Sequence, residues 1–155
     1  MHRNKVALLA FTAAIAMSVS NISFAADGKT SAGAFCQPRA DEYNIDRNAS
    51  GHAQNISTTT QFWTCPVIRD SMAPSLRDAQ MRVINATGTM SCTFYSRSAT
   101  GGYVSGVTRS TALSGGTVQT LSWGGIADAN NGYYYIRCTV PAGSRVISYS
   151  WVENT

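Results

Sequence analysis

The chain has 155 residues, with 12 Lys and Arg against 8 Asp and Glu and a formal net charge of +4. This surplus is small and scattered along the chain, whereas a nucleic-acid-binding protein shows a clustered basic face. The one long apolar run, over 6–19, has 14 residues, and a membrane-spanning helix needs about 20. The composition therefore predicts no nucleic-acid partner and no stable membrane insertion.

Residues 1–25 are predicted to be a cleaved secretory signal peptide. A basic start over 1–5 precedes the apolar run, and Ser23 and Ala25 supply small residues at the −3 and −1 positions of a cleavage site. Cleavage after Ala25 leaves ten Lys and Arg against eight Asp and Glu, a net charge of +2. We expect the mature protein to be secreted or periplasmic.

The mature chain is predicted to hold one domain over 36–155, because its length is typical of a single domain. Residues 26–35 are small and polar, and we expect them to form a flexible lead-in. The segment 36–60 is polar and irregular, with at most short strands around 43–45 and around Ile56.

Beyond residue 60, apolar and polar residues alternate with the period of half-buried strands. Trp63, Trp123 and Trp151 fall on the core side of this pattern, and Thr87-Gly88-Thr89 has the length of a hairpin turn. One helical turn is possible over 69–79. The strands are predicted at 62–68, 80–86, 90–97, 103–111, 118–123, 133–140 and 145–153. The spacing predicts an all-β fold, an antiparallel β-sandwich of seven or eight short strands, with a small barrel as the rival.

Four cysteines in an exported chain favour two disulfides over a metal site. No two cysteines are close enough for a C-x-x-C knuckle, and we expect no metal and no cofactor. Of the three possible connectivities we predict Cys36–Cys65 and Cys92–Cys138. Cys92 and Cys138 occupy inward positions of strong strands, while Cys36 lies in the irregular segment that has to be tied to the first strong strand.

Several segments together resemble a group of uncharacterised small secreted bacterial proteins. They are Cys65-Pro66-Val67-Ile68-Arg69-Asp70, Ser91-Cys92-Thr93-Phe94-Tyr95-Ser96, Leu121-Ser122-Trp123, Tyr134-Tyr135-x-x-Cys138-x-x-Pro141 and Ile147-Ser148-Tyr149. The resemblance covers the chain from about Cys65 to its end. It implies a disulfide-bonded β-sandwich and an extracytoplasmic location, and it brings no catalytic or binding residues.

Catalytic residues are not predicted. His52 is the only histidine of the mature chain and lies among Asn, Ser and Gly, so we interpret it as a solvated loop residue rather than a general base. The acidic residues fall in turns or at strand ends, where they do not form the carboxylate pair of a glycosidase. Residues 46–51 begin like a calcium loop, but Ser57 stands where a bidentate Glu is needed, which favours an ordinary Asx turn.

The aromatic residues of the strand at 133–140 provide the candidate binding site. If the Cys92–Cys138 bridge joins directly adjacent antiparallel strands, facing residue numbers sum to 230, so Tyr95 faces Tyr135 and Arg97 faces Tyr133 on the outer side. The predicted patch is Tyr95, Arg97, Tyr133, Tyr135 and Arg137. A bridge that spanned the two sheets would scatter this patch. Alternatively, these side chains only hold cross-strand pairs.

These observations favour a secreted, non-enzymatic module that binds an extracellular or envelope ligand, a sugar or a protein, through an aromatic sheet face or its loops. Two alternatives remain open at this stage. One is a small hydrolase acting on cell-wall or extracellular polymer, which would need a cleft with converging carboxylates. The other is an inhibitor or a subunit of a surface assembly, which a long unpaired edge strand would favour.

Overall fold

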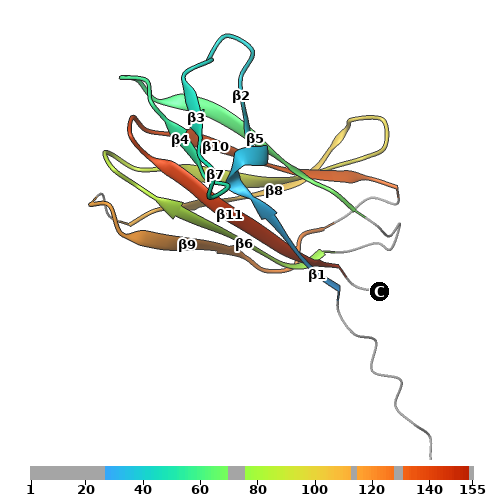
Figure 1. Ribbon diagram of the computed structural model, residues 1–155. Helices are drawn as coiled ribbons and strands as arrows, with labels where there is room; N and C mark the ends of the chain where they lie inside the picture. The colour runs from blue at the N-terminus through green and yellow to red at the C-terminus, as the bar shows by residue number, and fades with distance from the viewer. Residues whose placement is uncertain (1–26, 70–75, 113–114, 128–130, 154–155) are drawn as a thin grey trace, which may run out of the picture.

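The computed structural model describes residues 27–69, 76–112, 115–127 and 131–153, which form an antiparallel β-sandwich (Figure 1). The predicted signal peptide lies outside the described residues. One layer, sheet A, has the strand order β3-β4-β11-β6-β9, with β1 also paired to β11. Its strands are β1 (Asp27–Ala32), β3 (Ile45–Arg47), β4 (Ala53–Asn55), β6 (Leu76–Ile84), β9 (Val118–Trp123) and β11 (Arg145–Glu153).

The second layer, sheet B, has the order β2-β5-β10-β7-β8. Its strands are β2 (Gln37–Pro38), β5 (Gln61–Val67), β7 (Ser91–Arg97), β8 (Tyr103–Ser110) and β10 (Tyr133–Val140). A single 3-10 turn, η1 (Gly33–Phe35), precedes β2. The predicted fold class is confirmed, and seven of the strands lie where the alternation of apolar residues placed them.

The core lies between the two sheets and consists of the inward residues of that alternation. Trp63, Trp123 and Trp151 are all buried, as predicted. The Cys92–Cys138 disulfide packs on Met81 of the opposite sheet, with its two sulfurs 3.6 and 3.5 Å from the Met81 Sδ atom. A disulfide sulfur carries no proton, so this is a van der Waals contact that joins the layers at the centre of the core.

The prediction that Thr87-Gly88-Thr89 closes a hairpin is wrong. The strands on either side belong to different sheets, because β6 pairs with β11 and β9 while β7 pairs with β10 and β8. The connection is fixed by the buried side chain of Asn85, which donates to Gly88 O at 2.6 Å and to Thr111 Oγ1 at 3.0 Å. The connection therefore crosses from one layer to the other.

Two further expectations differ from the structure. Residues 27–32, which we expected to be flexible, form β1 and pair with β11 over six residues. Their local sequence is weak in strand signals, and the order comes from a partner strand about 120 residues away. The helical turn expected within 69–79 is absent from the described part of that range, where residues 76–79 belong to β6.

Candidate functional site

The two disulfides set the register on which the candidate site depends. They join Cys36 to Cys65 and Cys92 to Cys138, which is the predicted pairing. The second bridge links the adjacent strands β7 and β10 rather than the two sheets, and places Tyr95 opposite Tyr135 and Arg97 opposite Tyr133. The conditional prediction that facing residue numbers sum to 230 is therefore confirmed.

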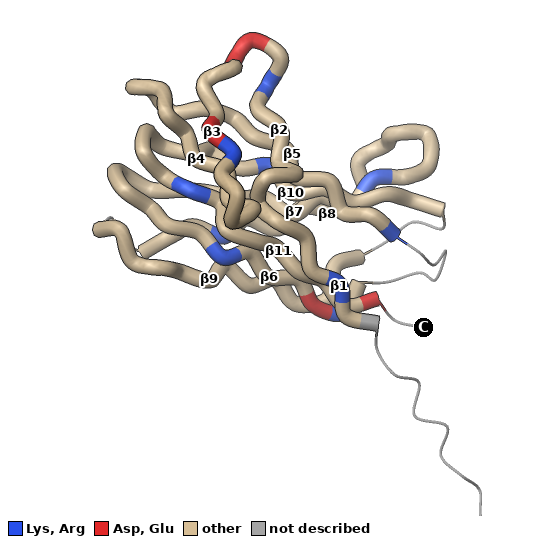
Figure 2. The backbone as a smooth tube through the Cα atoms, in the orientation of Figure 1, with Lys and Arg blue, Asp and Glu red and all other residues tan. Residues whose placement is uncertain are grey.

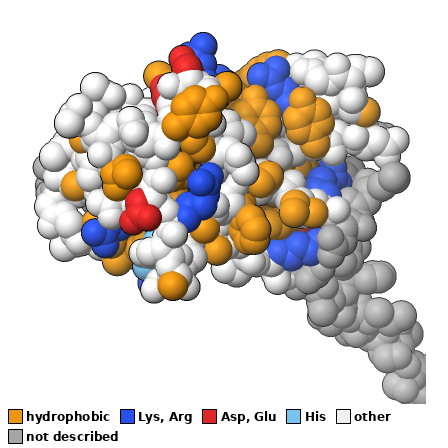
Figure 3. Space-filling model, turned by 45° about the horizontal axis from the view of Figure 1, so that its top comes forward, with side chains coloured by type: hydrophobic (Ala, Val, Ile, Leu, Met, Phe, Trp, Pro, Cys, Tyr) orange, Lys and Arg blue, Asp and Glu red, His pale blue; other side chains and the backbone are white. Residues whose placement is uncertain are grey.

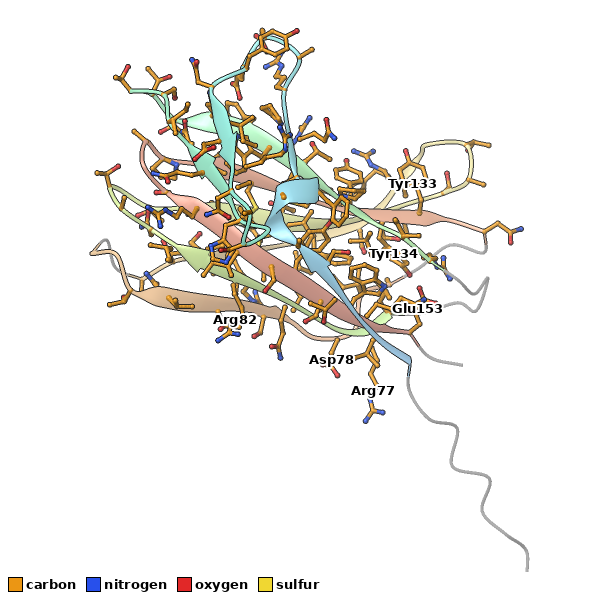
Figure 4. All side chains as sticks on the ribbon, viewed as in Figure 1. Arg77, Asp78, Arg82, Tyr133, Tyr134 and Glu153 are labelled. Atoms are coloured by element: carbon orange, nitrogen blue, oxygen red, sulfur yellow. A yellow bond between two sulfur atoms is a disulfide. The ribbon has the colours of Figure 1, made fainter. Side chains whose placement is uncertain are left out.

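The pleat of β10 separates core residues from surface residues. Tyr134 and Cys138 are buried, whereas Tyr133 and Arg137 are exposed and Tyr135 is half-buried. The labelled Tyr133 and Tyr134 accordingly extend to opposite sides of the ribbon (Figure 4). The structure thus places all five predicted site residues on the outer face of sheet B. Whether they bind a ligand stays a prediction.

Three tyrosines on this face form a continuous stack. The ring of Tyr135 lies 5.0 Å from that of Tyr95 on the neighbouring strand, at an interplanar angle of 24°, and 6.3 Å from that of Tyr133 on its own strand, at 26°. Pairs of this kind contribute about 0.5–1.5 kcal/mol beyond the area that they bury. The stack therefore fixes the positions of the three rings on the outer face and stabilises the pairing of β7 with β10.

Arg97 contacts two rings of the tyrosine stack, those of Tyr95 and Tyr135. Its Nε and Nη2 atoms donate hydrogen bonds to the Tyr135 hydroxyl at 3.2 and 3.1 Å, and its guanidinium carbon lies 5.6 Å from the Tyr95 ring and 5.9 Å from the Tyr135 ring. The hydrogen bond to Tyr135 raises the pKa of the Arg97 guanidinium above its ordinary value. The group is a fixed positive charge at the edge of the aromatic surface.

Tyr103, which the sequence analysis did not include, belongs to the same surface. Its ring packs edge-on against Tyr95 at 6.4 Å, and Arg97 lies 5.5 Å from its centre. Tyr103 faces Arg97 through a register shift in the β7–β8 hairpin. The glycine-containing loop at 98–102 signals the hairpin, but the register shift has no sequence signal. We name Tyr95, Arg97, Tyr103, Tyr133 and Tyr135 the tyrosine face.

Gly106 provides the close approach that the tyrosine face needs on β8. It lies opposite Tyr95, and a Cβ atom at this position would be 3.1 Å from Tyr95 Cδ1 and 3.3 Å from the Tyr103 hydroxyl. The Tyr95 ring therefore covers the β8 backbone at the one position of that strand that has no side chain, an arrangement that stabilises glycine in a sheet.

The other residues singled out from the sequence lie apart from one another. The His52 side chain has no hydrogen bond or ion pair within the described chain, and the Asn48 Oδ1 atom accepts from the backbone of Ser50 and His52, which is an Asx turn. Glu153 is buried and pairs with Lys29 at 3.3 Å. Within the described residues no group of three His, Cys, Asp or Glu could hold a metal ion.

Two edge strands lie side by side on one flank of the sandwich and are tied to each other by side chains. The Arg109 Nε atom of β8 donates to Ser122 O of β9 at 3.0 Å, and the Trp123 Nε1 atom of β9 donates to Val107 O of β8 at 2.8 Å. On the other flank, a cavity of about 480 Å³ opens between β2 and β3 and includes Tyr43 and Arg47 in its lining. It contains none of the predicted site residues.

No model of a known protein family matches the chain, and no curated protein does. Solved structures share its fold. The GH26-CBM35 β-(1,4)-mannanase of Podospora anserina is 14% identical with a TM-score of 0.51, over 83% of this chain and 28% of the mannanase chain. The C-terminal CBM6 of LamC, a marine laminarinase from Zobellia galactanivorans, is 12% identical with a TM-score of 0.54, over 82% of this chain and 100% of the module.

A third structure is CBM86, a low-affinity xylan binding module from Roseburia intestinalis. It is 10% identical with a TM-score of 0.50, over 82% of this chain and 96% of that chain. At such identities the likeness concerns the fold alone. The fold is therefore a β-sandwich of the kind seen in carbohydrate-binding modules. In the described part of the chain, no helix has the length and apolarity to cross a membrane.

Proposed function

We propose that this protein is an exported, non-catalytic carbohydrate-binding module and that the tyrosine face is its binding surface. The observation that carries the proposal is the ordered stack of Tyr95, Tyr135 and Tyr133 with Arg97 alongside, on the outside of a disulfide-braced sheet. The fold shared with carbohydrate-binding modules supports it, as do the predicted signal peptide and the two disulfides.

The chemistry of the tyrosine face matches that of a sugar. A pyranose ring has an apolar C–H face that packs on the electron-rich face of an aromatic ring, and hydroxyls at its rim that need hydrogen-bond partners. Within the tyrosine face, Tyr133 and Tyr103 are the rings most open to solvent, with 46% and 62% of their surface exposed. We assign sugar stacking to these two rings, and hydrogen bonding to the Arg97 guanidinium and the tyrosine hydroxyls.

The surface can bind with little reorganisation. Arg97 contacts Tyr95, Tyr103 and Tyr135 at once, so its long side chain is already ordered before a ligand arrives. Ordering such a side chain on binding would otherwise cost about 0.5–1.5 kcal/mol. In the space-filling view, hydrophobic side chains lie beside Lys or Arg side chains along the upper part of the molecule (Figure 3).

The test is retention of the purified mature protein by a panel of neutral and acidic polysaccharides in affinity gel electrophoresis. Tyr133→Ala and Tyr103→Ala are the test variants, since both rings are exposed and their loss leaves the core intact. Phe62→Ala is the matched control. Phe62 lies on the same outer face at 43% exposure, but its partner Thr139 is six residues along β10 from Tyr133, which is about 20 Å.

We expect at least one polysaccharide to retard the wild-type protein, and each tyrosine variant to lose affinity about tenfold or more. Phe62→Ala should bind like the wild type. Thermal unfolding of all variants distinguishes lost binding from lost folding. Failure of every polysaccharide to retard the protein, or wild-type retardation of the folded tyrosine variants, would remove the tyrosine face as a sugar site.

A further inference from the structure

Sheet B carries no acidic residue in any of its five strands. None of the eight Asp and Glu residues of the chain falls within these strands, which contain three arginines, Arg97, Arg109 and Arg137. The backbone coloured by charge shows this asymmetry, with red segments confined to the loop before β3, to β3 itself and to the strands of sheet A (Figure 2). The strands of sheet B therefore contribute only positive charge, and Glu42 reaches the sheet from outside, at β5, where its carboxylate accepts a hydrogen bond from Phe62 N.

Two of the three arginines face outward beside the tyrosine rings. Arg109 is turned to the flank of the sandwich, where it donates to Ser122 O. Arg97 and Arg137 are on the outer face, and Arg137 is four residues along β10 from Tyr133, the partner of Arg97. At the rise of an antiparallel strand the two positions are about 14 Å apart. The rings of Tyr135 and Tyr95 lie between them.

Arg137 differs from Arg97 in that its guanidinium makes no hydrogen bond or ion pair with any residue in the described part of the chain. It is exposed and lies in a polar row that crosses the sheet next to the tyrosines. Its register partners are Thr64 on β5 and Thr93 on β7, and the row continues to Gln37 and Thr108. The planar guanidinium can therefore offer two parallel N–H donors to an incoming anion.

We propose that the ligand of the tyrosine face is an acidic polysaccharide, with the anionic group of one sugar bound by Arg137 and the neighbouring rings on the tyrosines. This inference rests on the proposed function and specifies its ligand. A carboxylate of a uronic acid and a sulfate ester share the oxygen pair that a guanidinium binds. The bound chain then runs along β10, from Arg137 in the polar row over Tyr135 to Tyr133.

The experiment compares matched pairs of polymers that differ only in charge. Polygalacturonate is measured against the same polymer with its carboxyl groups reduced to alcohols, and a sulfated galactan against its desulfated form. Arg137→Gln is the test variant. Arg82→Gln is the control, because it removes the same charge from an exposed position on sheet A, and Figure 4 shows Arg82 on the opposite side of the molecule from Tyr133.

We expect one acidic polymer to bind at least tenfold more tightly than its uncharged form, with binding that weakens as salt is raised. Arg137→Gln should abolish that preference, while Arg82→Gln keeps it. A preference within the polygalacturonate pair identifies the bound group as a carboxylate, and a preference within the galactan pair identifies it as a sulfate. Equal binding of charged and uncharged forms, or a preference that survives in Arg137→Gln, overturns the acidic ligand and leaves the proposed function standing. Binding of no polymer at all overturns both.

Discussion

Gly33 packs directly against the backbone of β11, and replacing it with alanine should be among the most damaging single changes in this protein. A Cβ atom at residue 33 would lie 2.0 Å from Val146 O and 2.5 Å from Val146 C. Real Cβ atoms essentially never approach another atom within 3.0 Å, so one of the two segments has to move until the 2.0 Å contact opens to at least that distance. The register of β11 against β6 shifts between Val146 and Ser148, so the contact falls on an irregular stretch of that strand.

The clashing atoms belong to the main chain and cannot rotate away, so we place the cost at or above the upper end of overpacking, about 3 kcal/mol. If the chain relieves the clash by releasing η1 and β1, it forfeits the six β1–β11 residue pairs and the Lys29–Glu153 ion pair. For a domain of this size, 3 kcal/mol lowers the thermal midpoint by roughly 10–15 °C.

Thermal unfolding followed by circular dichroism measures the loss, and hydrogen exchange of the β1 amides shows whether that strand has detached. Gly28→Ala is the control, because Gly28 is in the same N-terminal segment and a Cβ atom there has no other atom within 4 Å. It should change stability by less than about 0.5 kcal/mol. A Gly33→Ala protein that melts within 2 °C of the wild type would show that the packing argument is wrong.

Three further outcomes are expected. Replacing Cys92 and Cys138 together with alanine opens a loop of 46 residues, which should lower the free energy of unfolding by about 4 kcal/mol in urea titrations; a loss under about 1 kcal/mol would contradict the loop-entropy estimate. Burial raises the pKa of Tyr149 above 10.0, partly offset by a hydrogen bond with Ser31, so the unfolded chain releases this proton first and stability should fall as pH rises above 10. Tyr149→Phe should flatten that fall, and an unchanged pH slope would exclude Tyr149 as its source. His52→Ala should shift stability by less than about 0.5 kcal/mol and leave polysaccharide retention intact, and a loss of retention would bring His52 into the site.

The sequence was sufficient to predict which side of the strongly alternating strands faces the core, and with it four of the five residues of the tyrosine face. Alternation fixes the side on which a residue lies, and one cross-strand disulfide then fixes the register of two strands. These two constraints together are enough to place Tyr95 opposite Tyr135. Tyr103 escaped the same reasoning because its position depends on a register shift between β7 and β8.

The sequence was not sufficient to predict which sheet a strand joins. Met81 and Phe94 are buried whether β6 and β7 pair in one sheet or face each other across the core, so the pattern is the same in both cases. Whether β6 and β7 share a sheet depends on the connection between them. Asn85 fixes that connection, since its buried side-chain amide donates hydrogen bonds to Gly88 and Thr111. A short loop between two alternating segments looks the same with or without such a residue. For β1, the partner strand is too distant in sequence for local patterns to reveal it.

The place of β11 in sheet A sets the order in which the sandwich can assemble during synthesis. β11 pairs with β1, β4 and β6, and without it the β3–β4 pair, the β6–β9 pair and β1 have no link to one another. Sheet B needs nothing beyond β10, and both disulfides lie within residues 36–138. Sheet B can therefore form and its disulfides can close while the parts of sheet A are still unlinked. Before residues 145–153 arrive, sheet A can cover the inner side of sheet B only through separate parts such as the β6–β9 pair, whose Trp123 packs on Phe94. This partly covered stage is the one most exposed to aggregation.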